Sequence, residues 1–527
     1  MRRFIFVGWT LLFIAGCSDS LPQNALTEAT DIDLEVATDQ GTVAGQRLPS
    51  DIHVFKGIPY AAAPVDDLRW RAPIPGSAWD TTRDATQFGK ICPQPPTIAA
   101  LTQEALPETD EDCLFLNVWT PAKTTGDALP VMVWIHGGGL SIGWSHQAGY
   151  DGEELAKRDV VLVSINYRLG PLGFLALPEL SAESSGTSGN YGFLDQVAAL
   201  QWVQRNIEAF GGDPGRVTIF GESAGGTSVV ALVASPITEG LIHGAIAQSP
   251  WVTDTNVANL DTPRTFVESA EDMGSQWIDT VAPDEELRTL EALRATPASE
   301  LVAEGGAQLP MYITVDGTFM PDNVEAAFQS GAQRNVPLMI GTNADEGTLF
   351  MLGGYGNREQ FQTAAHATYG DRADALLALY LQEDTSVRDA ANQFLTDTWF
   401  LRATRAILGG MNSVSAPTFQ YHFTRVRGAN PLGAHHAAEI GYVFKTAGLL
   451  GAQEGDVPEV VDEALTTAMM GYWTQFAKSG DPNAEGLVEW PAYSGKERSF
   501  LELGDTIVVG SALGAERLDQ LESILGQ

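Results

Sequence analysis

A serine flanked by glycines lies between two apolar runs of different character. Ser223 is the centre of Gly221–Gly225, which fits the pattern G-x-S-x-G. Residues 217–220 before it are β-branched or aromatic, which is typical of a strand, and the apolar residues 226–233 predict a buried helix. A sharp turn between strand and helix holds the serine Oγ clear of the sheet, and the helix N-terminus favours negative charge that develops there. We therefore predict that Ser223 is a nucleophile.

A second match to this pattern, around Ser141, has different surroundings. It follows the strand-like run 131–135 and the sequence His-Gly-Gly-Gly at 136–139, and it leads into Trp144 instead of an apolar helix. Glycine-rich loops of this type supply backbone N–H groups that stabilise a developing oxyanion. We therefore interpret the second match as part of an oxyanion hole and not as a second nucleophile.

A serine hydroxyl needs an adjacent histidine as base, and an acidic side chain must orient that histidine. When the serine lies on a strand–turn–helix elbow, the acid and the histidine follow it in the chain. Of the later histidines, the pair His435-His436 lies in a loop-like segment, and the others lie in strand-like or helical segments: His243, His366 and His422. The pair is favoured, and the local pattern does not separate its two members.

The acid is expected between the serine and the histidine pair. The apolar run 337–341 predicts a strand that leads into a glycine-bounded loop, 342–347. Catalytic groups gather beyond the carboxyl ends of strands in parallel sheets. Asp345 and Glu346 both lie in this loop, and the pattern alone leaves both as candidates.

The elbow predicts the α/β-hydrolase fold, with a central, mostly parallel sheet flanked by helices and the nucleophile after a central strand. The chain also resembles the type-B carboxylesterases, the family that includes acetylcholinesterase and bacterial para-nitrobenzyl esterases. Residues 210–225 match the serine signature of that family, and residues 111–121 match its second signature. Shorter matches lie at 55–61, 166–168, 189–192 and 195–196.

This resemblance implies a reaction and a set of site residues. It identifies Glu346 as the acid, and His436 as the base because Glu439 follows it by three places, as in the family. The oxyanion donors that it implies are the backbone N–H groups of Gly138, Gly139 and Ala224. The expected reaction is hydrolysis of a small-molecule carboxylic ester through an acyl-enzyme, with no metal or organic cofactor.

The N-terminal residues predict export. A basic pair precedes the apolar run 4–15, which is too short to span a bilayer and is typical of a secretory signal. Residues 14–17 resemble the bacterial lipobox, so we expect a lipid on Cys17. An ordinary signal peptide that is cleaved nearby is the alternative.

These features divide the chain into three parts. We expect a signal peptide at 1–16, a polar tether at 17–33 and a single hydrolase domain at 34–527, although length alone would suggest about three domains. Because Ser18 and not aspartate follows the cysteine, an outer-membrane or cell-envelope lipoprotein is favoured over a periplasmic or secreted protein.

Three cysteines are an odd number for an exported protein. If Cys17 carries lipid, Cys92 and Cys113 remain as a disulfide pair, and two buried free thiols are the alternative. The resemblance also aligns this pair with a family disulfide, and it aligns Arg69 and Glu111 with an ion pair near it.

The composition limits the partners. A net charge of −37, from 30 basic and 67 acidic residues, argues against nucleic-acid binding. It predicts an acidic, self-repelling surface, with adaptation to a salty medium as a sharper alternative. Membrane contact is expected only through the lipid anchor, and the sequence does not indicate the oligomeric state.

The substrate preference is less well defined by the sequence. The segment between Cys92 and Cys113 has no aromatic residue, so it provides no cation–π site for a choline ester. Three aromatic residues are candidates for the gorge or, more commonly, for the core: Trp134, Trp144 and Phe174. Hydrolysis of amides, thioesters or lactones is one alternative function, and a non-enzymatic adhesion role is another.

Overall fold

The computed structural model describes residues 32–96, 104–284, 286, 288–302, 312–353, 355–428, 430–446 and 459–526. The predicted signal peptide, Cys17 and all but the last two residues of the predicted tether lie outside these ranges. Within them, no helix combines the length and the apolar composition that a bilayer-spanning segment needs.

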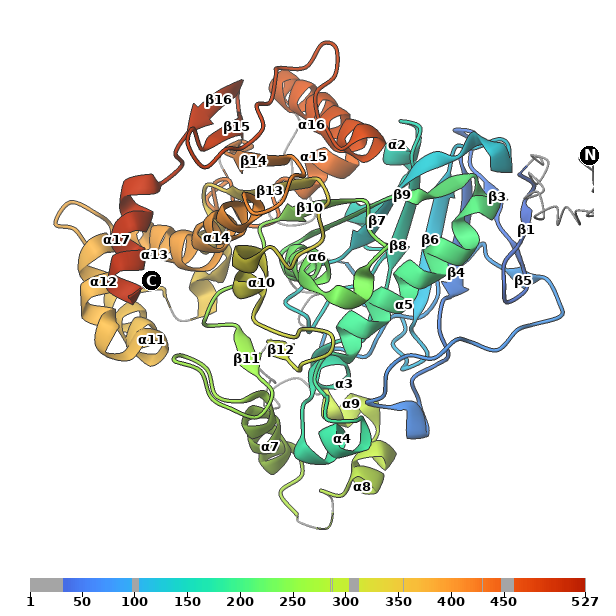
Figure 1. Cartoon of the computed structure of the whole chain (residues 1–527), viewed down its shortest axis with the longest axis horizontal. Helices are drawn as coiled ribbons and strands as arrows, with labels where there is room; N and C mark the ends of the chain where they lie inside the picture. Colours follow the sequence, from blue (N-terminus) through green and yellow to red (C-terminus); the bar gives the residue numbers. More distant parts are fainter. Residues whose placement is uncertain are drawn as a thin grey trace, which may run out of the picture.

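The largest sheet holds eleven strands among the described residues. They are β3 (Gln46–Arg47), β4 (His53–Pro59), β6 (Phe115–Thr120), β7 (Leu129–Ile135), β8 (Val161–Ile165), β9 (Gly212–Glu222), β10 (Gly244–Gln248), β13 (Leu338–Asn343), β14 (Thr418–Phe423), β15 (Ser499–Leu503) and β16 (Ile507–Ser511). Their order is β16-β15-β14-β13-β10-β9-β7-β8-β6-β4-β3 (Figure 1). The strands from β15 to β8 are parallel to one another, and the pairs at both ends of the sheet are antiparallel. The expected mostly parallel sheet is confirmed, and β9 lies at its centre.

The remaining elements surround this sheet. Small sheets pair β1 (Glu35–Ala37), β2 (Thr42–Ala44) and β5 (Arg83–Asp84), and β11 (Val257–Asn259) with β12 (Ile313–Val315). The α-helices are α2 (Glu153–Ala156), α3 (Gly170–Phe174), α4 (Pro178–Glu183), α5 (Tyr191–Asn206), α6 (Ala224–Ala234), α7 (Ala270–Val281), α8 (Leu290–Ala295), α9 (Ala298–Leu301), α10 (Val324–Ser330), α11 (Arg358–Tyr369), α12 (Ala373–Tyr380), α13 (Val387–Leu395), α14 (Arg402–Met411), α15 (Ile440–Phe444), α16 (Val460–Ser479) and α17 (Ala515–Leu525).

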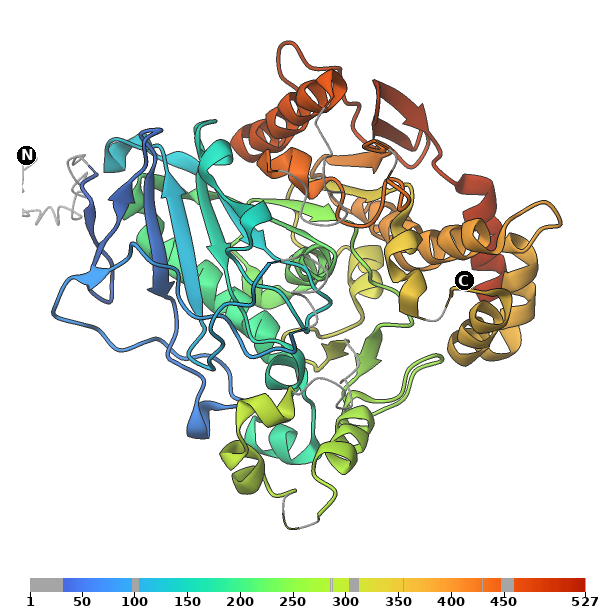
Figure 2. The same ribbon diagram turned by 180° about the vertical axis from the view of Figure 1, so that it is seen from behind.

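Strand β7 is apolar along its whole length because both faces of the sheet are covered there. In β7, Val131 and Val133 pack into a core with α5 and α6, while Met132 and Trp134 pack into a second core with α15 and α16. Successive side chains of a strand point to opposite faces, so a strand between two helical layers needs an unbroken apolar run. Figure 2 shows the strands of the N-terminal half side by side from behind.

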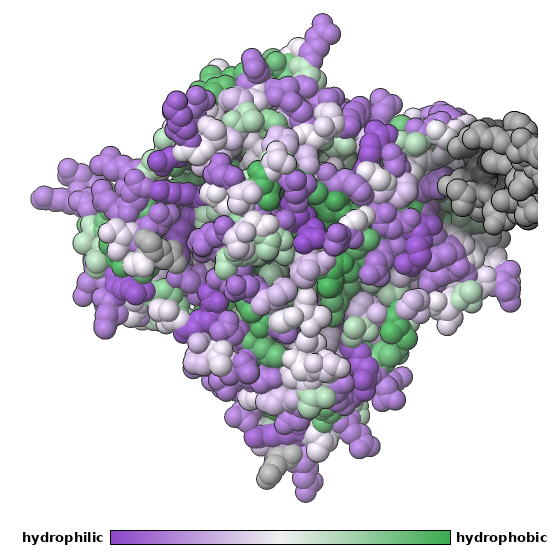
Figure 3. All heavy atoms as spheres, viewed as in Figure 1, coloured by the Kyte–Doolittle hydropathy of each residue, from purple (hydrophilic) through white to green (hydrophobic). Residues whose placement is uncertain are grey.

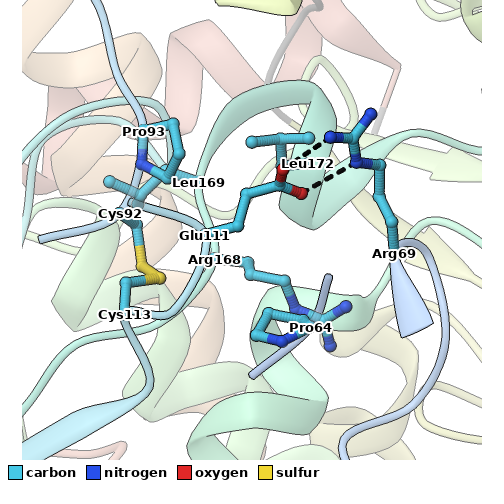
Figure 4. Close-up of a pocket in the computed structure, with 9 residues that line it drawn as sticks. All are labelled: Pro64, Arg69, Cys92, Pro93, Glu111, Cys113, Arg168, Leu169 and Leu172. Carbon is cyan, nitrogen blue, oxygen red and sulfur yellow. Dashed lines mark hydrogen bonds and ion pairs between the residues drawn. A yellow bond between two sulfur atoms is a disulfide. The ribbon is translucent and has the colours of Figure 1, made fainter. Parts of the chain in front are cut away.

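The predicted disulfide between Cys92 and Cys113 is present. It closes a loop with a sequence separation of 21, which stabilises the fold by about 3 kcal/mol in the chain-entropy model. Next to it, Arg69 forms the expected ion pair with Glu111, with Nε 2.8 Å from Oε1 (Figure 4). The N-terminal third of the chain is therefore cross-linked close to the sheet.

Hydrophilic residues dominate the visible surface, and hydrophobic residues form only small groups on it (Figure 3).

Candidate active site

Ser223 lies on a strained turn between β9 and α6, with φ 57° and ψ −120°. Its backbone N–H donates to the Gln248 carbonyl at 2.9 Å, which fixes the turn against β10. A Cβ at Gly221 would lie 2.5 Å from the Ile135 carbonyl oxygen, and one at Gly225 would also collide with that oxygen. The glycines on both sides are therefore required because β7 passes so close to the elbow.

Glu346 and His436 form a buried pair at the carboxyl end of the sheet. The Glu346 Oε2 lies 2.5 Å from the His436 Nδ1. Its Oε1 accepts hydrogen bonds from the Ser249 hydroxyl at 2.6 Å and from the Asn343 backbone N–H at 2.7 Å. With both oxygens occupied and no exposed surface, this carboxylate is fixed in one orientation.

The side chains of the other two candidates, Asp345 and His435, have different partners. Asp345 accepts from the Asn392 side chain at 2.9 Å and from the Ala434 backbone N–H at 2.9 Å, so it holds the histidine loop in place. The Nδ1 of His435 lies 2.7 Å from the carbonyl oxygen of His436. The Glu346 carboxylate therefore contacts the His436 imidazole, whereas Asp345 and His435 are paired through a backbone β-bridge.

Glu439 connects the segments around this pair. Its carboxylate accepts from the Gln248 side chain at 2.8 Å and from the Asn343 side chain at 2.6 Å. Gln248 holds the Ser223 turn through its carbonyl, and Asn343 donates its backbone N–H to Glu346. One buried carboxylate thus links the ends of β10 and β13, and burial raises its pKa.

Glu222, the residue before the nucleophile, is the other neighbour of the imidazole. Its Oε1 lies 3.1 Å from the His436 Nε2, and both side chains are 4 % exposed. Burial raises the pKa of Glu222 to about 8. Burial also acts to lower the pKa of His436, but the charges of Glu222 and Glu346 outweigh it and raise that pKa to about 9. The imidazolium is therefore strongly stabilised at this position.

The glycine-rich loop packs against the elbow at Gly137. Gly138 and Gly139 have φ values of 100° and 61°, which side chains rarely adopt. A Cβ at Gly137 would lie only 3.1 Å from the Cβ of Ser223. Ala224 is the first residue of α6, where helix N–H groups have no intrahelical partner. The start of this loop, at Gly137, and the N-terminus of α6 are thus next to the serine.

Four aromatic side chains extend outward from the imidazole, and no sequence motif indicated them. Phe350 and Phe400 have ring centroids 5.0 Å and 4.8 Å from that of His436. Trp399 packs edge-on against Phe350 at 5.3 Å and stacks on Trp251 at 4.3 Å. Phe350 lies in the 3₁₀ turn that begins at Glu346, and Trp399 and Phe400 lie in a π-helical turn, Thr396–Leu401. This set, the aromatic wall, is partly exposed except for Phe400.

The aromatic residues that the sequence offered lie elsewhere. Trp134, Trp144 and Phe174 are all buried, so they contribute to the core. Among the other candidate histidines, His366 lies 3.2 Å from Asp374 on the surface, His243 lies next to Val217, and His422 lies in β14 opposite Thr342. In the described part of the chain, no group of three or more His, Cys, Asp or Glu side chains is arranged to hold a metal ion.

A mostly parallel sheet with a serine on a strand–turn–helix elbow, next to a buried acid–histidine pair, defines the class of α/β-hydrolases. Comparisons with known proteins identify the family. Residues 32–520 match the model of the carboxylesterase family. The chain is 36 % identical over 498 residues to the para-nitrobenzyl esterase of Bacillus subtilis, covering 92 % of this chain and 98 % of that one.

Two further relatives agree. The chain is 36 % identical over 537 residues to a fumonisin B1 esterase of Sphingopyxis macrogoltabida, covering 96 % and 92 % of the two chains. A solved structure of a thermophilic PNB esterase superimposes with a TM-score of 0.81 at 33 % identity, covering 92 % of this chain and 99 % of that one. The chain belongs to the carboxylesterase family and is a carboxylic ester hydrolase, as the resemblance predicted.

Proposed function

We propose that the ester is cleaved by Ser223, His436 and Glu346 acting as a catalytic triad. The Ser223 Oγ attacks the ester carbonyl carbon while the His436 Nε2 takes the hydroxyl proton. Glu346 holds the Nδ1–H of the imidazole and stabilises the imidazolium that forms. The observation that carries this assignment is the 2.5 Å contact between the Glu346 Oε2 and the His436 Nδ1 next to the strained elbow.

The remaining steps use the same groups. The backbone N–H groups of Gly138, Gly139 and Ala224 stabilise the oxyanion of the tetrahedral intermediate. His436 then gives its proton to the leaving alkoxide, and the acyl group stays on Ser223. Water repeats the sequence on the acyl-enzyme, so the acid product leaves and the serine regains its proton.

The aromatic wall supports a preference for uncharged, apolar esters. Phe350 packs against the His436 imidazole, Trp399 packs against Phe350, and Trp251 stacks on Trp399. These three partly exposed rings can cover an apolar acyl or alkoxy group. A related esterase is named for para-nitrobenzyl esters. A panel of matched apolar esters and amides tests whether the enzyme is specific for the ester bond. We expect turnover of 4-nitrophenyl and benzyl esters and little turnover of the amides, and amide turnover at the ester rate would contradict it.

Replacing Glu222 with glutamine is expected to shift the pH dependence of turnover. The charge of Glu222 raises the pKa of His436, and only the neutral imidazole can accept the serine proton. Activity therefore increases as the pH passes upward through the imidazole pKa, and Glu222→Gln moves this rise to lower pH. The measurement is kcat/KM from pH 5 to 10, with Glu222→Asp as the control that keeps the charge. A rise at unchanged or higher pH in Glu222→Gln would exclude this role.

We also propose that the enzyme is a lipoprotein of the bacterial cell envelope, on the basis of the lipobox-like residues 14–17. Cys17 lies outside the described residues, so this proposal rests on the sequence. Expressed in a bacterial host, the full chain should take up a fatty-acid label and partition into detergent, and Cys17→Ser should do neither. Label on the Cys17→Ser variant, or wild-type enzyme free in the aqueous phase, would contradict the anchor.

A further inference from the structure

We infer that Gln94 is a positioning residue for the oxyanion loop, Gly137–Gly143, and that the disulfide between Cys92 and Cys113 holds it there. This inference rests on the proposed oxyanion donors Gly138 and Gly139. It assigns the disulfide a direct link to the chemistry in addition to its effect on stability.

The oxyanion loop has a strained backbone. Gly138, Gly139, Leu140 and Gly143 have φ values of 100°, 61°, 57° and 111°. The loop closes on itself, because the N–H groups at 141 and 142 both donate to the Gly138 carbonyl, at 3.1 Å and 3.0 Å. A strained conformation of this kind persists only when its surroundings hold both ends. β7 and the elbow hold the N-terminal end of the loop, and Gly143 is its C-terminal end.

The side-chain amide of Gln94 binds both the backbone N–H and the backbone carbonyl of Gly143. Its Oε1 accepts the Gly143 N–H at 2.7 Å, and its Nε2 donates to the Gly143 carbonyl at 2.9 Å and to the Cys92 carbonyl at 3.1 Å. The side chain is 5 % exposed. Both polar backbone groups of Gly143 are thus satisfied by one side chain, two residues from the disulfide. Position 143 requires glycine because a Cβ would lie 2.5 Å from the His136 ring.

The other half of the disulfide reaches the same end of the loop. Asn166 donates its Nδ2 to the Cys113 carbonyl at 3.1 Å and accepts the Ser145 N–H on its Oδ1 at 2.9 Å. Each half-cystine segment is therefore linked through one buried amide side chain to the end of the oxyanion loop, Gln94 to Gly143 and Asn166 to Ser145 just after it. The disulfide joins the two half-cystine segments to which these side chains are bonded (Figure 4 shows the disulfide).

Loss of the Gln94 amide leaves the two polar groups of Gly143 unpaired and lets this end of the loop move. The Gly138 and Gly139 N–H groups are needed most when negative charge develops, so a displaced loop lowers kcat and leaves KM nearly unchanged. Loss of a whole oxyanion donor costs roughly 10²–10³-fold in kcat. We expect a fall of about 10- to 100-fold for a loop that is displaced but still present.

The test compares Gln94→Met and Gln94→Glu with Gln333→Ala. Gln333 is the matched control: it is 4 % exposed and donates to the Gly410 carbonyl at 3.2 Å, away from the loop. For each variant, kcat per fluorophosphonate-labelled site, KM, the melting temperature and the Ki of a trifluoromethyl ketone are measured. In both Gln94 variants we expect kcat to fall and Ki to rise in parallel, whereas Gln333→Ala loses only melting temperature.

A second comparison tests the link to the disulfide. The double variant Cys92→Ser, Cys113→Ser should lose kcat by a similar factor, and adding Gln94→Met should lower kcat little further because both changes release the same anchor. A cysteine variant with wild-type kcat would overturn the role of the disulfide. The Gln94 variants, which keep the disulfide, decide whether Gln94 positions the loop.

Failure of this inference is distinguishable from failure of the triad. Wild-type kcat and Ki per labelled site in both Gln94 variants would overturn the inference and leave the triad intact. Absence of label on Ser223 in the wild-type enzyme would overturn the triad itself.

Discussion

Replacing Ser223 with alanine is expected to abolish ester turnover while the fold remains intact. Removal of the nucleophile in a serine hydrolase costs about 10⁶-fold in kcat, because no other group can form the acyl-enzyme. The methyl group of alanine fits the elbow, where the packing constraint falls on the flanking glycines. The measurement is turnover of a 4-nitrophenyl ester by purified enzyme, with circular dichroism and the melting temperature as checks on the fold.

Ser141 is the informative comparison because it is the other serine in a G-x-S-x-G pattern. Its backbone N–H closes the oxyanion loop at 3.1 Å, and alanine keeps that bond. Ser141→Ala should therefore keep most of the turnover. If Ser141→Ala were inactive and Ser223→Ala active, the nucleophile would be assigned to the wrong serine.

Replacing His436 with glutamine is the second change with a very large expected effect. Without the imidazole, nothing takes the proton of Ser223 or returns it to the leaving alkoxide, so kcat should fall by roughly 10⁴–10⁶-fold. His435→Gln is the matched control, since His435 is equally buried but its Nδ1 contacts the His436 carbonyl and not Glu346. It should lose far less activity, and any loss should follow its loss of melting temperature.

The same substitutions also test which of the two adjacent histidines acts as the base. Comparable losses in both variants at equal melting temperature would mean that His435 takes part in the chemistry. A fully active His436→Gln variant would exclude the proposed base. Rates are compared per folded enzyme, because both side chains are in the interior.

The sequence predicted the elements of the site well because each has a local cause. A turn as tight as the one at Ser223 can be built only with glycines at 221 and 225, since β7 leaves no room for a Cβ. The mostly parallel sheet follows from apolar runs such as β7, which must be covered on both faces. These constraints act within a few residues, so they are visible in the sequence.

The local sequence could not separate adjacent candidate residues, because the partners that distinguish them lie far away in the chain. Asp345 and Glu346 are adjacent acids in one loop, and only their partners separate them. Asp345 contacts Asn392 and a backbone N–H, whereas Glu346 contacts His436. These contacts join residues that are about 50 to 90 positions apart, so the resemblance to a family, and not the local pattern, indicated the two side chains that are in contact.

The aromatic wall could not be predicted for the same reason. Trp251 comes from the loop after β10, Phe350 from the turn after β13, and Trp399 from a π-helical turn beyond α13. None of these segments has a motif, and only the fold brings the rings together. Glu222 is an intermediate case, because its place beside the serine was evident but its 3.1 Å contact with the His436 Nε2 was not.

The most direct test of the central claim is to label the purified enzyme with a fluorophosphonate and to identify the modified residue by peptide mass, alongside a 4-nitrophenyl ester series. We predict one label, on Ser223, together with loss of ester turnover in proportion to labelling. Label on another serine, or full turnover after Ser223 has been labelled, would contradict the account.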